Sequence, residues 1–200
     1  KCNLSCTYCS ADAGPDQTEA LSLEAALRHV DDWLLRSADE PQRQLVFSGG
    51  EPTLWGYERL DAVCARAHAH GVKIGMQTNA TTIGERFVRW CRDWDVEPSI
   101  SLDGPPWLSD ERRGLGERVE TGLLRLREEG IGFAVIVCLS KRVIDNIEAV
   151  LDYFADKGFS KLRMNTLGDP PRGRMIDAVN AGDLLRAKQA IYRRVEGGLD

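Results

Sequence analysis

The chain has 200 residues, of which 42% are hydrophobic and 28% charged, a balance typical of one globular domain with a full core. Its formal net charge of -5 at pH 7 argues against a broad basic surface for DNA or RNA. No apolar run approaches the roughly 18 residues of a membrane span, and no signal-peptide pattern is present. We therefore expect a cytoplasmic protein whose partners include neither nucleic acid nor membrane.

The first feature along the chain is a cysteine loop. Cys2, Cys6 and Cys9 follow the spacing C-x-x-x-C-x-x-C. Thiolates select Zn, Cu(I) or iron-sulfur clusters, and these short spacings let one loop wrap its sulfurs around a single centre. A structural zinc site closes with four ligands and a ferredoxin cluster normally takes four cysteines, so three leave one coordination position open. No histidine lies near the loop to complete a zinc site, but the spacing alone leaves zinc and a disulfide as alternatives.

Beyond this loop, apolar periodicity predicts helices alternating with strands. Ser22 is the expected N-cap of a first helix over 23–36. Strands are predicted at 45–47, 72–77, 98–102, 131–139 and 161–165, and further helices at 57–70, 85–93, 118–129 and 144–157. Gly71 is expected to end the second helix. Because strands and helices alternate strictly, the fold class is α/β with a parallel sheet.

A loop of this kind should follow a strand, so a strand before residue 1 would bring the number of strands to six. We therefore expect residues 1–200 to be one core domain taken from a longer protein. Six parallel strands can form a partial barrel or an open doubly wound sheet, and periodicity does not decide between them. In either case the functional site should lie at the carboxyl ends of the strands.

Polar motifs stand at three of those strand ends. The segments are Ser48-Gly49-Gly50-Glu51-Pro52, Gln77-Thr78-Asn79-Ala80-Thr81 and Ser99-Ile100-Ser101-Leu102-Asp103-Gly104-Pro105. Paired glycines let the backbone approach a ligand, and a neighbouring carboxylate can accept hydrogen bonds from an ammonium group. Taken one at a time, each motif is also what an ordinary turn or helix cap contains.

Together, the cysteine loop and these motifs resemble the radical SAM enzymes. The family signature is this cysteine spacing with an aromatic residue before the last cysteine, here Tyr8, and a GGE motif about forty residues later. The resemblance implies a partial (β/α)6 barrel. It also implies that Cys2, Cys6 and Cys9 hold three irons of a 4Fe-4S cluster, whose fourth iron is chelated by the amino and carboxylate groups of S-adenosylmethionine (SAM).

The resemblance further implies residues that bind SAM. The family places the GGE motif at the amino group, the TN segment along the pocket and the serine of S-x-D-G at the carboxylate; with Tyr8, these residues are Gly49, Gly50, Glu51, Asn79 and Ser101. An arginine commonly supports that carboxylate, because its fork donates two parallel hydrogen bonds. Arg113 is the candidate and Arg118 the alternative. Leu167, after the last strand, could form a wall for adenine or simply pack the rim.

The order of the motifs, including a P-x-G-R stretch at 171–174, is similar to the peptide- and protein-modifying maturases of this family. That branch includes the sulfatase-maturating enzymes and usually carries a C-terminal SPASM or twitch extension with auxiliary clusters, whereas no cysteine follows Cys138 here. The resemblance implies that a 5'-deoxyadenosyl radical abstracts hydrogen from a peptide or protein substrate. It also implies an electron donor such as flavodoxin or ferredoxin.

Three other interpretations remain open at this point. One is a radical SAM enzyme acting on a small molecule in cofactor biosynthesis, and the others are a non-catalytic iron-sulfur module and a zinc-stapled binding domain. Cys64, Cys91 and Cys138 stand singly in apolar patterns, so packing is the simplest role for them. Hydrogen abstraction needs no general base, and we assign no catalytic side chain.

Overall fold

A computed structural model describes residues 1–109, 114–166 and 179–196 of the chain. Its strands form a single parallel sheet in the order β1-β2-β3-β4-β5, so each strand pairs with its neighbour in sequence. The strands are β1 (Gln44–Phe47), β2 (Lys73–Thr78), β3 (Ser99–Ser101), β4 (Ala134–Leu139) and β5 (Leu162–Thr166). All five strands predicted within the sequence are thereby confirmed.

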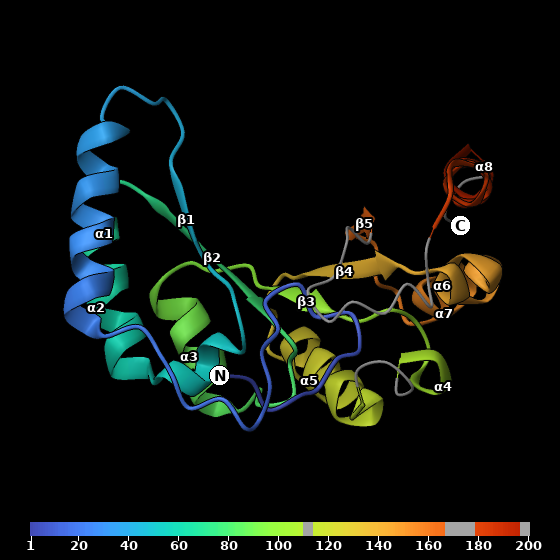
Figure 1. The fold of residues 1–200 in the computed structure, drawn as a ribbon, viewed down its shortest axis with the longest axis horizontal. Helices are drawn as coiled ribbons and strands as arrows, with labels where there is room; N and C mark the ends of the chain where they lie inside the picture. Colours follow the sequence, from blue (N-terminus) through green and yellow to red (C-terminus); the bar gives the residue numbers. More distant parts are fainter. Residues whose placement is uncertain (110–113, 167–178, 197–200) are drawn as a thin grey trace.

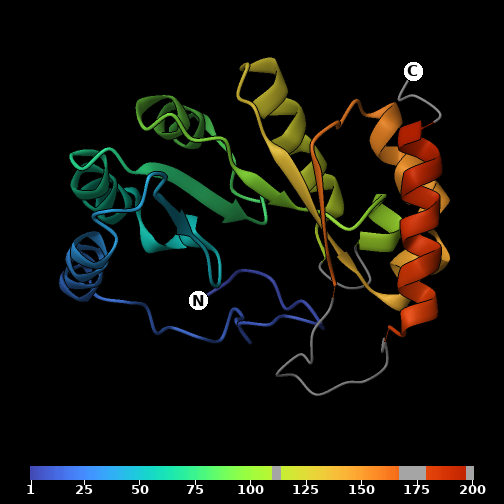
Figure 2. The same ribbon diagram turned by 90° about the horizontal axis from the view of Figure 1, so that it is seen from above.

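The strand order decides between the two predicted architectures. A doubly wound sheet reverses its strand order at a switch point, whereas a barrel adds each strand on the same side of the last one. The order here never reverses, and the sheet curves so that helices cover its outer face while segment 1–20 crosses the opposite side (Figures 1 and 2). The fold is therefore the expected partial α/β barrel.

Helices connect the strands and supply the outer layer. They are α1 (Leu23–Arg36), η1 (Pro52–Trp55), α2 (Tyr57–His68), α3 (Glu85–Asp93), α4 (Pro106–Ser109), α5 (Gly116–Glu128), α6 (Lys141–Asp145), α7 (Ile147–Asp156) and α8 (Ala181–Glu196). Their apolar faces meet the sheet in one core, in which Leu60, Phe87, Ile100, Leu123 and Val137 are fully buried. Within the described residues, every helix is too short or too polar to cross a membrane.

Local caps account for several helix boundaries. The Ser22 side chain accepts a hydrogen bond of 3.1 Å from the Ala25 N–H, which confirms the predicted cap of α1. Gly71 has a φ of 69°, the left-handed conformation expected after a helix, although α2 itself ends at His68. The predicted helix over 144–157 is two helices, because Ser140 caps α6 and Asn146 separates it from α7.

Three helices were not predicted. η1 and α4 are only four residues long and begin at Pro52 and Pro106, whose fixed φ suits a first helical turn. α8 packs against α6 and α7 beyond the last strand. The strand predicted over 131–139 begins only at Ala134, after Gly130 and Gly132.

Candidate functional site

The three clustered cysteines lie at the carboxyl ends of the strands, as predicted. Cys2 is buried, and Cys6 and Cys9 are half-buried thiols in a tight turn whose Cys9 N–H donates to the Cys6 carbonyl at 3.3 Å. With Tyr8, they line a cavity of about 290 Å³. The facing wall comes from the carboxyl ends of all five strands and includes Gly49, Gly50, Asn79, Ser101, Cys138 and Asn165.

The end of strand β1 fixes the start of the cysteine loop. The Glu51 N–H donates a hydrogen bond of 2.9 Å to the Lys1 carbonyl. A Cβ added to Gly50 would lie 1.8 Å from the same carbonyl oxygen, so no side chain fits there. Gly50 is thus required for the close approach of two backbones, which adds a structural role to the predicted ligand contact.

The end of strand β2 fixes the loop a second time. The Asn79 side-chain NH₂ group donates a hydrogen bond of 2.9 Å to the Asn3 side-chain oxygen. The same nitrogen donates to the Cys2 sulfur, 3.8 Å away. The Leu4 N–H also donates to that sulfur, at 3.4 Å. Donors directed at cysteine sulfur are what iron-sulfur thiolates receive, because they stabilise the charge on the sulfur.

Glu51 is buried under this loop, with 3% of its surface exposed. Its Oε1 accepts hydrogen bonds of 2.8 Å from the hydroxyls of Thr53 and Thr78 and one of 3.2 Å from the Thr53 N–H, and its Oε2 accepts one of 2.8 Å from the Asn79 N–H. The carboxylate therefore joins the ends of β1 and β2. Gly49 and Gly50 line the cysteine cavity, whereas Glu51 lines a second cavity behind them.

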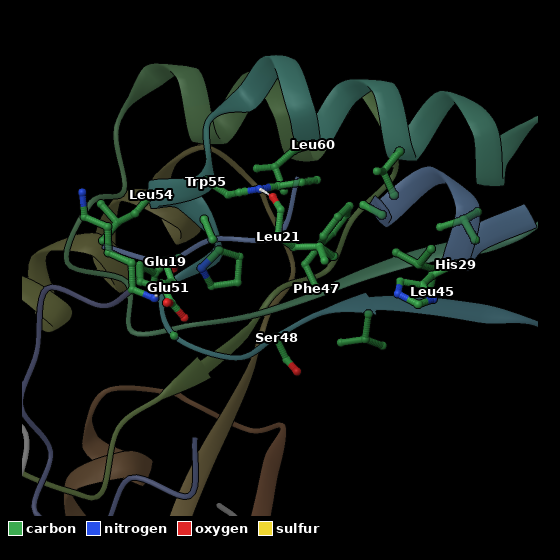
Figure 3. Close-up of a pocket in the computed structure, with 18 residues that line it drawn as sticks. Glu19, Leu21, His29, Leu45, Phe47, Ser48, Glu51, Leu54, Trp55 and Leu60 are labelled. Carbon is green, nitrogen blue, oxygen red and sulfur yellow. Dashed lines mark hydrogen bonds between the residues drawn. The ribbon is translucent and has the colours of Figure 1, made fainter. Parts of the chain in front are cut away.

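That second cavity, of about 360 Å³, lies between α1, β1 and η1 (Figure 3). Its wall is mostly apolar, and the Trp55 indole N–H closes one side by donating to the Leu21 carbonyl at 2.7 Å. His29 contributes a polar ring from α1. The cysteines lie on the other side of Gly50, so we place the chemistry in the first cavity.

The remaining predicted residues separate into two groups. Ser101 and Tyr8 line the cysteine cavity, and the Tyr8 hydroxyl donates to Oδ2 of Asp103. Arg113, Leu167 and the 171–174 stretch lie outside the described residues. Arg118, the alternative to Arg113, is exposed on α5.

The isolated cysteines have two different environments. Cys64 and Cys91 are buried in the core, as predicted, and burial raises the pKa of each thiol from 9.0 to about 12. Cys138 is not simply a packing residue: it is half-buried and lines the candidate cavity. The sequence could not show this, because β4 is apolar on both faces.

The chemistry of the cysteine set fits an iron-sulfur cluster, because thiolates are the ligands that such clusters take. Among the described residues, no three His, Cys, Asp or Glu side chains are arranged to hold one metal ion. Cys2, Cys6 and Cys9 form no disulfide and line one cavity, and hydrogen-bond donors are directed at the Cys2 sulfur.

Comparison with known families decides the assignment. Residues 1–154 match the family described as the radical SAM superfamily. The chain belongs to this superfamily. Its members are enzymes that use a 4Fe-4S cluster and SAM, which confirms both cofactors expected from the cysteine loop.

Two curated relatives have names that describe different chemistry. The Fe-coproporphyrin III synthase of Methanosarcina barkeri is 29% identical over 81% of this chain and 40% of its own length. A cysteine-type anaerobic sulfatase-maturating enzyme of Clostridium perfringens is 26% identical over 84% of this chain and 50% of its own length. The chain therefore spans half the length of these relatives or less.

Solved radical SAM structures share the fold. Native anSMEcpe with bound AdoMet and Kp18Cys peptide superposes with a TM-score of 0.81 at 22% identity, covering 98% of this chain and 59% of that one. Streptococcus suis SuiB bound to precursor peptide SuiA superposes with a TM-score of 0.74 at 18% identity, covering 98% and 44%. These similarities establish the architecture.

Proposed function

We propose that this chain is the core of a radical SAM enzyme that abstracts hydrogen from a peptide or protein substrate. The observation that carries the proposal is the single cavity between the cysteine loop and the strand ends, lined by Cys2, Cys6 and Cys9 together with Gly49 and Ser101. Three of the relatives and neighbours named above act on a protein or bind a peptide according to their names, which supports this substrate class.

In this proposal the two sides of the cavity bind different cofactors. Cys2, Cys6 and Cys9 would hold the cluster, and the backbone at Gly49 and Gly50 would lie against SAM. When bound, the two cofactors supply a one-electron cleavage of the sulfonium that yields a 5'-deoxyadenosyl radical. The strand ends orient the reacting groups and exclude water.

Glu51 would act in two ways. Its Oε1 is occupied by three protein donors, and its Oε2 by one. A carboxylate oxygen accepts about two hydrogen bonds, so Oε2 keeps one position. Glu51 itself does not line the cysteine cavity, so the amino group of SAM would have to reach Oε2 past Gly49 and Gly50, which do line it. We keep Ser101, Arg113 and Leu167 as proposed contacts of the SAM carboxylate and adenine.

A second candidate function is a radical reaction on a small molecule. It is supported by the Fe-coproporphyrin III synthase, which matches 81% of this chain. Both candidates need the same cofactor residues and differ only in what reaches the cavity. The proposed electron donor, a flavodoxin or ferredoxin in the cytoplasm, serves either reaction.

Anaerobic reconstitution tests the proposal. We expect the purified protein to take up iron and sulfide, to absorb visible light, and to form 5'-deoxyadenosine from SAM when a chemical reductant is added. Candidate peptides and iron coproporphyrin are then supplied in separate reactions, and mass spectrometry follows each. A colourless zinc protein without deoxyadenosine would overturn the enzyme assignment, and a change only in the porphyrin would favour the second candidate.

A further inference from the structure

Asp103 is a buried carboxylate to which the proposed cofactor contacts give no role. It follows β3 and has 2% of its surface exposed. Burying a carboxylate is costly unless hydrogen bonds satisfy it. The hydrogen-bond partners of Asp103 therefore indicate its role.

These partners come from three separate parts of the chain. Oδ1 accepts a hydrogen bond of 2.9 Å from the backbone N–H of Cys138 in β4, and Oδ2 accepts one from the hydroxyl of Tyr8. The Asp103 N–H contacts the Ser109 hydroxyl of α4 at 3.4 Å. One side chain thus connects the cysteine loop to the ends of two neighbouring strands.

The bond to Tyr8 reaches the part of the loop that carries two of the cysteines. Tyr8 lies between Cys6 and Cys9, and its ring is buried with 7% of its surface exposed. The contacts of Gly50 and Asn79 hold the beginning of the loop, at Lys1, Cys2 and Asn3. Asp103 instead fixes the loop between its second and third cysteine.

We propose that Asp103 is a positioning residue, which acts through the Tyr8 hydroxyl to hold Cys6 and Cys9 where they retain the iron-sulfur cluster and set its reduction potential. This inference rests on the proposed function for the presence of the cluster. A hydrogen bond to a charged acceptor is among the stronger ones in proteins, so its loss should free this half of the loop.

Tyr8→Phe tests the hydroxyl alone, because the ring and its packing stay in place. In the metal-free protein we expect the Cys9 amide to exchange its hydrogen about tenfold faster, while the Cys2 amide, held by the Gly14 carbonyl, keeps its rate. In the reconstituted protein we expect about tenfold faster loss of iron to a chelator.

Asp103→Asn tests the charge, because an amide keeps an oxygen for the Cys138 N–H and presents its NH₂ group to Tyr8. Removal of a negative charge beside the loop should shift the cluster potential to a more positive value. The double variant Tyr8→Phe with Asp103→Asn should lose iron no faster than Tyr8→Phe alone, since Asp103 acts on iron retention only through the Tyr8 hydroxyl, which both variants lack.

Matched controls separate positioning from general destabilisation. Tyr192→Phe removes an exposed hydroxyl on α8, and Asp183→Asn alters a buried carboxylate that pairs with Arg186. Asp183→Asn should lower the melting temperature, but neither control should change iron loss or potential.

The outcomes distinguish this inference from the proposed function. In Tyr8→Phe, the Cys9 amide hydrogen could exchange at the wild-type rate and iron could be lost at the wild-type rate. That result would show that the positioning role is wrong, even if the enzyme is active. If the wild-type protein makes no deoxyadenosine, the proposed function fails, while exchange in the metal-free protein still reports on the Tyr8 connection. Additive effects in the double variant would also overturn the role, because they would mean that the two residues act separately.

Discussion

The backbone N–H of Asn79 donates a hydrogen bond of 2.8 Å to Oε2 of Glu51, which joins the ends of strands β1 and β2 under the cysteine loop. Glu51 is therefore both a proposed SAM contact and a structural link between strands. Substitutions at this residue should change ligand affinity and stability together.

We first predict the effect of Glu51→Gln. An amide offers one acceptor oxygen, so its NH₂ group must face a protein donor in place of the other oxygen. The free energy of unfolding should fall by about 1–3 kcal/mol, and SAM should bind more weakly because its ammonium loses a charged partner. Chemical denaturation and calorimetric titration measure the two effects.

The control for this variant is Thr78→Val, which removes one hydroxyl from Oε1 but leaves the carboxylate in place. It should lower stability and keep SAM affinity. If Glu51→Gln binds SAM as the wild-type protein does, Glu51 has no contact with the ligand.

A second prediction concerns the close approach at Gly50. In Gly50→Ala the new methyl group would collide with the Lys1 carbonyl oxygen. The backbone must therefore shift, and this shift displaces the beginning of the cysteine loop. We expect less iron bound after reconstitution, measured against protein concentration. Gly84→Ala is the matched control, because nothing lies within 4 Å of its added Cβ and it should bind iron normally.

The third prediction separates the cluster thiols from the core thiols. Cys6→Ala should abolish the visible absorbance and the formation of deoxyadenosine, because a ligand of the cluster is lost. Cys64→Ala should unfold at a lower temperature yet keep both signals, since Cys64 is fully buried in the core. Equal loss of absorbance in the two variants would contradict the assignment.

The fourth prediction is a loss of stability in base. The thiols of Cys64 and Cys91 ionise near pH 9.0 when unfolded, whereas burial raises their pKa to about 12 in the folded chain. The folded state thus binds more protons between these values. Stability is unaffected by these groups below about pH 9 and falls above it, by roughly 1.4 kcal/mol per pH unit for each thiol.

The double variant Cys64→Ala with Cys91→Ala tests this pH dependence. It should be less stable than the wild-type protein at pH 7, but its free energy of unfolding should fall less steeply from pH 9 to 11. Denaturant titrations at a series of pH values give the free energy of unfolding of both proteins as a function of pH. If it falls equally steeply in the wild-type protein and in the double variant, these thiols do not control the loss of stability.

Much of the fold could be predicted because local signals and tertiary structure agree. Helix α1 has both a regular apolar period and Ser22 as its cap, and its predicted bounds match those observed. Helix α3 was also predicted residue for residue. The single predicted helix over 144–157 failed because Asn146 interrupts an otherwise continuous apolar pattern.

The site could be predicted only in part, for a physical reason. The cysteine spacing and glycines are local, so they can be recognised along the chain. The bonds from Glu51 to Thr78 and from Tyr8 to Asp103 join residues far apart in sequence, and they depend on which strands pair. Cys138 could not be recognised as a cavity residue, because neighbouring positions on both faces of β4 are apolar.

The anchoring of the cysteine loop also bears on how the protein is made. The loop leaves the ribosome before the groups that hold it, which come from Gly50, Asn79 and Asp103. Its final shape must therefore await synthesis of strands β1 to β4, since Asp103 is itself held by Cys138 in β4. Iron delivery to the fully shaped loop is accordingly a late event in biogenesis, after translation of most of this segment.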